Sequence, residues 1–179
     1  MNVITLEDKK FVQYILAADI NESITRMATQ IDEDYKNDKP IFIITLNGAV
    51  FFAVELLKKL KIDTYITSIR LSSYEGTSST AEMKEIIGLK ENLNGKRVIV
   101  LEDIVDTGKT YEHILRILEK ENVKDVRIAT LTFKSDAYKK PYPVHYAGFS
   151  IPDKFIVGYG LDYDGRGRNL SDIYQIVTE

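Results

Sequence analysis

Short apolar runs and longer segments with a helical period alternate along most of this chain. Five runs rich in β-branched or aromatic residues predict buried strands at residues 41–46, 62–71, 98–101, 126–133 and 155–160. Three segments in which apolar residues recur every three to four positions predict helices at residues 11–34, 49–60 and 107–120. The predicted elements therefore follow one another mainly as strand, helix, strand.

This alternation predicts an α/β fold with a mainly parallel central sheet flanked by helices. Ligands of such sheets bind beyond the carboxyl ends of the strands. The informative side chains should therefore follow Leu46, Leu71, Leu101, Phe133 and Gly160. There is no internal repeat and no interdomain linker, and 179 residues suit one domain spanning residues 1–179.

Composition excludes several classes of function. The chain has no cysteine, which excludes disulfides, thiolate catalysis, iron–sulfur clusters and cysteine-based zinc sites. A net charge of -3 provides no broad basic surface, so we expect no nucleic-acid partner. The apolar stretch 41–57 contains Asn47, Gly48 and Glu55 and is shorter than the ~20 residues of a membrane span. We therefore expect no membrane partner and a cytoplasmic location.

The strongest chemical signal is VIVLEDIVDTGKT at residues 98–110. A buried strand leads to Glu102 and Asp103, which we expect at its exposed end, where they would hold vicinal hydroxyls directly or through a divalent cation. A turn containing Asp106 follows. Backbone N–H groups at the start of the next helix, with the hydroxyls of Thr107 and Thr110, would form a cradle for a phosphate group. Gly108 would let the backbone approach the ligand. These features suit a phosphorylated sugar.

Two other interpretations of this motif are weaker. A nucleotide-triphosphatase P-loop needs glycine five positions before Gly108, but residue 103 is Asp. Alternatively, Glu102 and Asp103 could be a solvated strand end and Asp106 an ordinary helix cap. Three acids within five residues, directly after an apolar strand, favour a ligand site.

These residues resemble the phosphoribosyl-pyrophosphate-binding signature of the type I phosphoribosyltransferases. Within that family, FKSD at residues 133–136 and DKFIVGYGLDYDGRGRNL at residues 153–170 resemble the hypoxanthine–guanine enzymes. The resemblance implies the family's fold, with a small hood region over the carboxyl ends of the strands. It also implies transfer of phosphoribosyl from phosphoribosyl pyrophosphate to a 6-oxopurine base in purine salvage, which gives IMP or GMP and pyrophosphate.

The resemblance also implies roles for the motif residues. Glu102 and Asp103 would bind the ribose hydroxyls and Mg²⁺. The 5′-phosphate cradle would consist of Asp106, Thr107, Gly108, Lys109 and Thr110. Asp106 would in addition be the general base facing purine N7.

Residues outside this motif receive roles from the same resemblance. Asn47 and Gly48 match the pyrophosphate loop, although many relatives carry Lys where this chain has Asn47. Lys134 would donate to the purine 6-oxo group, and because an ammonium has no acceptor it would reject the 6-amino group of adenine. The remaining implied ligands are the stacking ring of Phe155, the backbone carbonyl of Ile156, the magnesium ligand Asp162, and Arg168 or Arg166 for pyrophosphate.

The polar segment 72–81 follows a predicted strand and is either a plain solvent loop or a lid. Ser73 and Tyr74 in it match the paired residues of the family's mobile catalytic loop. Taken singly, Asn47-Gly48 could be a plain turn, Lys134 a surface lysine and Phe155 a core residue.

Two alternative functions and the oligomeric state stay open at this stage. The enzyme could prefer xanthine, or the chain could be a non-enzymatic nucleotide-sensing regulator on the same fold. Asp106, Lys134 and Phe155 together, with the pI of ≈ 5.5, argue against the regulator. The family usually forms homodimers or homotetramers, and the sequence does not decide between them.

Overall fold

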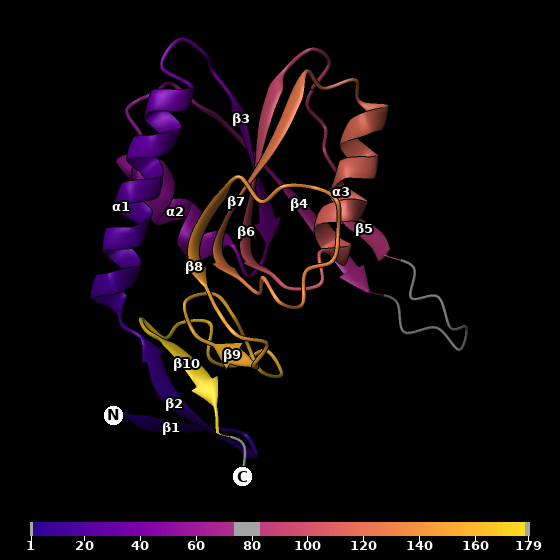
Figure 1. The fold of residues 1–179 in the computed structure, drawn as a ribbon. Helices are drawn as coiled ribbons and strands as arrows, with labels where there is room; N and C mark the ends of the chain where they lie inside the picture. Colours follow the sequence, from indigo (N-terminus) through magenta and orange to yellow (C-terminus); the bar gives the residue numbers. More distant parts are fainter. Residues whose placement is uncertain (1, 74–82, 178–179) are drawn as a thin grey trace.

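The computed structural model describes residues 2–73 and 83–177, and a six-stranded sheet lies at its centre (Figure 1). The strand order is β5-β4-β3-β6-β7-β8. All neighbours pair in parallel except β5, which runs antiparallel to β4 at one edge. The strands are β3 (Ile41–Leu46), β4 (Tyr65–Ser73), β5 (Met83–Ile87), β6 (Arg97–Val105), β7 (Asp125–Phe133) and β8 (Tyr146–Ser150). The α/β architecture with a mainly parallel sheet is thus confirmed.

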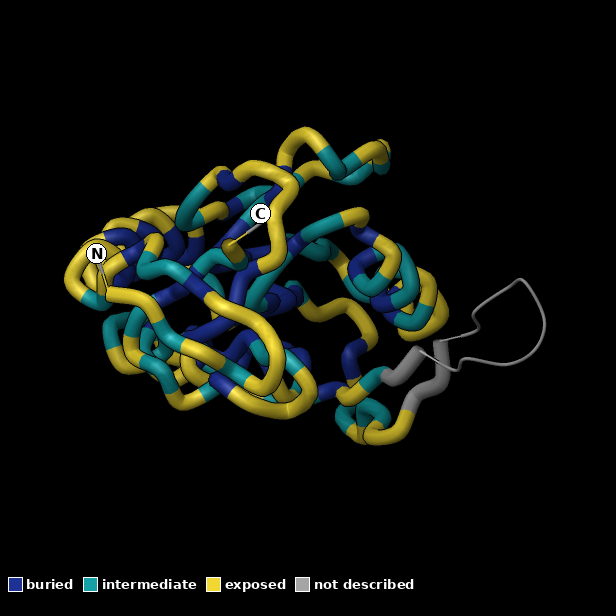
Figure 2. Tube along the Cα trace, turned by 90° about the horizontal axis from the view of Figure 1, so that it is seen from below, coloured by how far each residue is buried: buried dark blue, intermediate teal, exposed yellow. Residues whose placement is uncertain are grey.

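Helices cover both faces of this sheet, as the alternation of buried residues requires. On one face, α1 (Ala17–Asp34) and α2 (Val50–Lys59) pack against inward residues such as Phe42 and Ile99. On the other face, α3 (Lys109–Lys120) packs against alternate residues of the same strands, including Ile43 and Val100. Strands buried on both faces explain why these runs are continuously apolar. Figure 2 shows buried residues gathered in the interior and exposed residues along the outer parts of the trace.

A second, antiparallel sheet joins the two ends of the chain below the first (Figure 1). Its order is β1-β2-β10-β9, and its core contains Phe11, Val157 and Tyr174. The strands are β1 (Val3–Leu6), β2 (Lys9–Ile15), β9 (Ile156–Val157) and β10 (Ile173–Ile176). This sheet lies on the side of the carboxyl ends of the parallel strands, where the hood was expected.

Two predicted elements differ from the structure in this region. The helix predicted for residues 11–34 begins only at Ala17, because residues 11–15 belong to β2 and pair with both β1 and β10. The strand predicted for residues 155–160 shrinks to Ile156–Val157 and lies in the second sheet, because Gly158 and Gly160 have φ of 98° and 102° and turn the chain. The first difference comes from pairing with residues far away in the sequence, and the second from the backbone conformation of two glycines.

The strand predicted for residues 98–101 is longer than expected and extends to Val105. Glu102, Ile104 and Val105 pair with Thr130, Thr132 and Phe133 of β7. Glu102 and Asp103 therefore lie within β6, and the expectation that they stand at its exposed end was wrong. Glu102 is buried and Asp103 is half-buried, which also disfavours the alternative of a solvated strand end. In the part of the chain described, no helix combines the length and apolarity needed to cross a membrane.

Candidate active site

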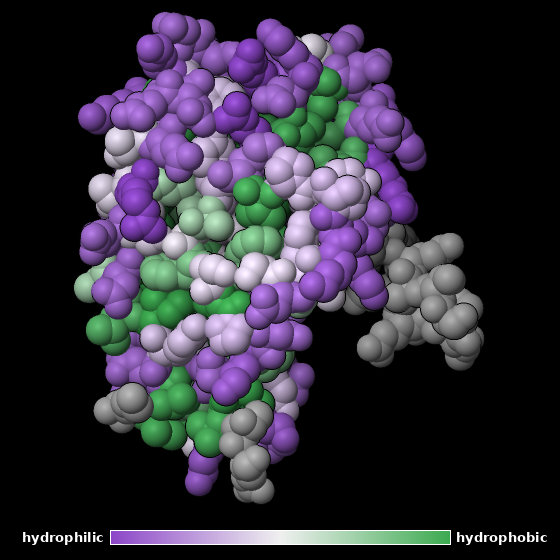
Figure 3. Space-filling view, viewed as in Figure 1, coloured by the Kyte–Doolittle hydropathy of each residue, from purple (hydrophilic) through white to green (hydrophobic). Residues whose placement is uncertain are grey.

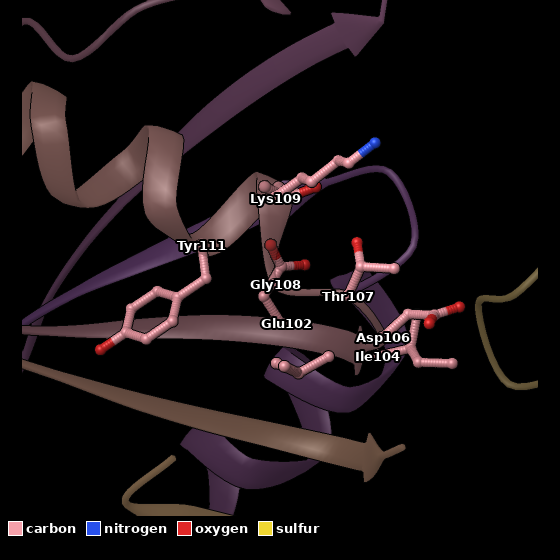
Figure 4. Close-up of a pocket in the computed structure, with 9 residues that line it drawn as sticks. Glu102, Ile104, Asp106, Thr107, Gly108, Lys109 and Tyr111 are labelled. Atoms are coloured by element: carbon pink, nitrogen blue, oxygen red, sulfur yellow. The ribbon is translucent and has the colours of Figure 1, made fainter. Parts of the chain in front are cut away.

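Segments that follow three parallel strands meet at one edge of the large sheet and enclose two adjoining clefts. The larger, of about 340 Å³, is lined by residues of β3, β4 and β6 and of the loops beyond, namely Thr45, Leu46, Asn47, Gly48, Leu71, Glu102, Asp103, Ile104, Thr110 and Arg168. The smaller, of about 130 Å³, is lined by Glu102 and residues 104–111 (Figure 4). The two clefts share Glu102, Ile104 and Thr110. Together they form one continuous site.

The smaller cleft is built around the start of α3. Gly108 precedes the helix with φ of 79°, and no side chain caps the helix. The first intrahelical bond at this end runs from the Glu112 N–H to the Gly108 carbonyl, so the N–H groups before Glu112 lie ahead of the helical ladder. Such free donors, with the helix dipole, attract an anion. The start of α3 thus has the donors that the predicted phosphate cradle requires, and phosphate binding there stays a prediction.

Gly108 has a structural role in addition to the one expected from the sequence. A Cβ at this position would overlap the ring of Tyr138, and the positive φ disfavours any side chain. Glycine therefore suits the packing against Tyr138 and the turn into α3, and its role in the approach of a ligand stays a prediction. In Figure 4, Lys109 extends away from the strand and Thr107 is exposed beside Asp106.

Glu102 and Asp103 are two neighbouring acids with little access to water. Glu102 is 4% exposed, and its Oε1 has no hydrogen-bond partner among the described residues. Burial, with a smaller contribution from Asp103, raises the pKa of Glu102 well above its usual range. Burial also raises the pKa of Asp103 to about 6, although its Oδ1 accepts a 2.9 Å hydrogen bond from the Ile104 N–H. Neither carboxylate forms an ion pair with a residue that the structure describes, although the positive charge of Arg168 acts to lower the pKa of Asp103.

The loop after β3 is held between Asp103 and the second sheet. The peptide bond between Leu46 and Asn47 is cis. A Cβ at Gly48 would overlap the carboxylate of Asp103, and a Cβ at Gly160 would overlap the Gly48 carbonyl. The two glycines therefore allow three backbone segments to stack at the larger cleft.

Arg168 connects the second sheet to this cleft. Its guanidinium donates to the Gly160 carbonyl at 2.7 Å and pairs with Asp162 at 2.6 Å. Arg166 pairs instead with Glu7 and lines neither cleft. Of the two arginines considered from the sequence, Arg168 is the one that lines the site. Asp162 is engaged on both oxygens, because its Oδ2 accepts from the Gly165 N–H at 2.7 Å.

Lys134 lies beyond β7 and bridges two carboxylates. Its Nζ is 2.8 Å from Asp106 Oδ2 and 2.9 Å from Asp153 Oδ1, while its side chain is only 8% exposed. Burial alone would lower the pKa of Lys134, but the hydrogen bonds to both acids outweigh it and raise the pKa. The lysine is therefore a buried cation. Asp153 was missed by sequence reasoning, although it stands two positions before Phe155 in the DKF segment.

The structure does not bring every expected residue to the clefts. Phe155 is 44% exposed and packs beside Phe11 and Tyr163, so it is not a core residue. Ile156 is buried in β9, and neither it, Phe155 nor Asp162 lines the two clefts. Tyr74 and the side chain of Ser73 lie outside the described residues.

Residues 15–164 match the family model described as the phosphoribosyl transferase domain. The hypoxanthine-guanine-xanthine phosphoribosyltransferase of Tritrichomonas foetus is 39% identical over 154 residues, which are 85% of this chain and 84% of that protein. The hypoxanthine phosphoribosyltransferase of Escherichia coli is 34% identical over 89% of this chain and 92% of its own. A crystal structure of a hypoxanthine-guanine phosphoribosyltransferase from Bacillus anthracis superposes with a TM-score of 0.87 at 33% identity, covering 97% of this chain and 100% of that chain.

Proposed function

This chain belongs to the phosphoribosyltransferase family, and we propose that it transfers phosphoribosyl from phosphoribosyl pyrophosphate to hypoxanthine or guanine in purine salvage. The observation that carries the proposal is the adjacency of three features. An uncapped helix start lies beside a buried acid pair, and a buried lysine is hydrogen-bonded to Asp106 at the end of the same strand. These features suit a phosphate, a pentose and an oxopurine in that order.

We assign the sugar phosphate to the smaller cleft and pyrophosphate to the larger one. The backbone N–H groups of Thr107, Gly108, Lys109 and Thr110 would bind the 5′-phosphate, with the hydroxyls of Thr107 and Thr110. Glu102 and Asp103 would accept hydrogen bonds from the ribose hydroxyls. Pyrophosphate would lie against the backbone of Asn47 and Gly48 and the guanidinium of Arg168, which together line the larger cleft.

The acid pair also fits Mg²⁺. Mg²⁺ is commonly held by one or two carboxylates together with phosphate oxygens of the substrate. Glu102 and Asp103 offer that number, and Glu102 Oε1 is buried without a partner among the described residues. When bound, the ion would neutralise charge on the departing pyrophosphate. Asp162 suits a second ion less well, because Arg168 and the Gly165 N–H already engage its oxygens.

On the base side, Asp106 and Lys134 would act together. Asp106 would take the proton from purine N7, and Lys134 would donate to the 6-oxo group. Phe155 would stack on the purine ring, and the Ile156 carbonyl would face the 2-position. The catalytic roles expected for Ser73 and Tyr74 stay predictions.

A base panel tests this function. Purified protein with Mg²⁺ and phosphoribosyl pyrophosphate should convert hypoxanthine and guanine, while adenine should react roughly 10⁴-fold more slowly, because a donor meets a donor at Lys134. Efficient formation of AMP would contradict the assignment of Lys134. No turnover with any base would favour a nucleotide-binding regulator instead.

Xanthine is a second candidate substrate. It shares the 6-oxo group that Lys134 would bind, and the relative from Tritrichomonas foetus is named for hypoxanthine, guanine and xanthine. The same panel decides it through kcat/KM for xanthine relative to hypoxanthine.

We further propose that the chain acts as a single-domain subunit of a cytoplasmic homodimer or homotetramer. Exposed apolar side chains on α2, β4 and β5 support self-association, since a lone subunit would leave Phe51, Val54, Tyr65, Ile66 and Ile86 in water. Hydrophobic surface also lies over the second sheet in the lower part of the molecule (Figure 3). Sedimentation equilibrium would give the subunit number, and cell fractionation the location.

A further inference from the structure

Three consecutive strand ends bring Asp106, Lys134 and Asp153 into one row. The Lys134 N–H donates to the Val105 carbonyl at 2.9 Å, which fixes the lysine beside the residue preceding Asp106. The Ile151 N–H donates to the Phe133 carbonyl at 2.9 Å, which fixes the segment carrying Asp153 beside the residue preceding Lys134. Backbone hydrogen bonds therefore set the order acid, lysine, acid along the edge formed by β6, β7 and β8.

The number of hydrogen bonds that Lys134 can donate shows what this row of side chains leaves for a ligand. An ammonium has three N–H donors and no acceptor. Two of them point to Asp106 and Asp153, at 2.8 Å and 2.9 Å. One donor is left for a ligand, and two carboxylates keep the lysine charged although it is buried.

The two carboxylates have different roles in the proposed reaction. Asp106 must be free to accept a proton from the base, whereas the strong ion pair with Lys134 holds its oxygen. If Asp106 were the only acid beside the lysine, the ammonium would rest on it alone, and both groups would be withdrawn from the purine. A second acid on the far side shares the ammonium and draws it away from Asp106.

We propose that Asp153 is a positioning residue that holds Lys134 toward the 6-oxo group and releases Asp106 for proton transfer. This inference rests on the proposed function. Neither Asp153 nor Lys134 lines the two clefts, and the one hydrogen bond of the Asp153 side chain within the described chain is to Lys134, so Asp153 acts through the lysine.

The test compares Asp153→Asn with Asp136→Asn in the full chain. Asp136 is an exposed acid two residues after Lys134 with no ion pair to any residue that the structure describes, which makes it a matched control. We expect Asp153→Asn to lower kcat/KM for hypoxanthine about tenfold, the scale of one charge-assisted hydrogen bond. The KM for phosphoribosyl pyrophosphate should stay unchanged, and Asp153→Glu should recover part of the loss. Asp136→Asn should behave as the parent protein.

Binding of two nucleotides separates positioning from a structural effect. Affinity for IMP should fall in Asp153→Asn, while affinity for purine riboside 5′-monophosphate, which lacks the 6-oxo group, should not change. In a Lys134→Gln background, Asp153→Asn should have no further effect on IMP affinity.

Two results would overturn the inference while leaving the proposed function intact. One is an active parent enzyme in which Asp153→Asn behaves as Asp136→Asn. The other is an equal loss of affinity for both nucleotides, or an additive loss in the Lys134→Gln background. A parent protein that converts no base contradicts the proposed function itself, whatever the variants do.

Discussion

At the scale of single residues, Asp106 has the most direct chemical role that we propose. It follows β6, its side chain is 43% exposed, and its one ion pair in the described chain is with Lys134. We expect Asp106→Asn to lower kcat by about 10²–10⁴-fold, because an amide cannot accept the purine proton in the transition state. Steady-state kinetics with hypoxanthine measure this. Turnover equal to that of the parent would remove the general-base role.

Protonation of a second single residue, Asp103, makes the stability of the folded chain depend on pH. Burial raises its pKa to about 6 from 3.8, so the folded chain binds this proton more tightly than the unfolded chain. The stabilisation from protonated Asp103 is therefore complete below about pH 4 and is lost as the pH rises through about 6. Above that, an ionised buried carboxylate destabilises the fold.

Asp103→Asn should remove this part of the pH dependence. Without Mg²⁺, the variant should unfold with a free energy higher than that of the parent by at most about 3 kcal/mol at pH 7.5 and by little at pH 4. Urea unfolding at the two pH values measures it. Parallel pH profiles for the two proteins would show that Asp103 is not desolvated as described.

At the scale of elements, the loop after β3 depends on two glycines. Gly48→Ala would force the new methyl group into Asp103, so the loop or the carboxylate must move. We expect kcat/KM for phosphoribosyl pyrophosphate to fall about 10²-fold, since small displacements of site groups have effects of that size. Gly95→Ala is the control for backbone strain away from the site, because its φ is 69° but a Cβ there meets no atom within 4 Å and Gly95 lines neither cleft; it should leave this kinetic parameter unchanged. An unaffected Gly48→Ala enzyme would contradict the packing.

The start of α1 depends on an acid from the other end of the chain. Leu16 offers no side-chain cap, and Asp172 instead accepts from the Ala17 N–H and from Gln13, both at 2.7 Å. We expect Asp172→Ala to lower the free energy of unfolding by about 1–2 kcal/mol, as for a lost helix cap. Thermal unfolding against Asp136→Ala measures it. Equal midpoints for the two variants would show that Asp172 does not stabilise α1.

The elements of the fold differ in how far the sequence alone could predict them. The apolar runs of β3 and β7 and the period of α3 are local signals, and the structure confirms those elements. Residues 11–15 fit a helical spacing as well as a strand, and only pairing with β10, some 160 positions away, decides between them. The extension of β6 through Val105 has the same cause, since its ladder with β7 is a tertiary contact.

At the scale of the whole molecule, the candidate site is assembled from segments spread over more than a hundred residues. The placement of residues 102–110 on one strand, turn and helix could be predicted because the motif is local in the sequence, while the roles of these residues stay predictions. The row of Asp106, Lys134 and Asp153 could be predicted only in part, because the pairing of Asp153 with Lys134 depends on how β8 adds to the sheet. Phe155 and Ile156 lie on the second sheet, whose existence depends on both ends of the chain meeting.

A crystal structure of this protein with guanosine monophosphate would locate the active site. We expect the phosphate at the start of α3, the ribose hydroxyls within hydrogen-bonding distance of Glu102 and Asp103, and the 6-oxo oxygen within that distance of Lys134 Nζ. A nucleotide whose sugar lies far from the acid pair, or whose phosphate lies away from Thr107 and Thr110, would contradict the assignment of this edge of the sheet as the active site.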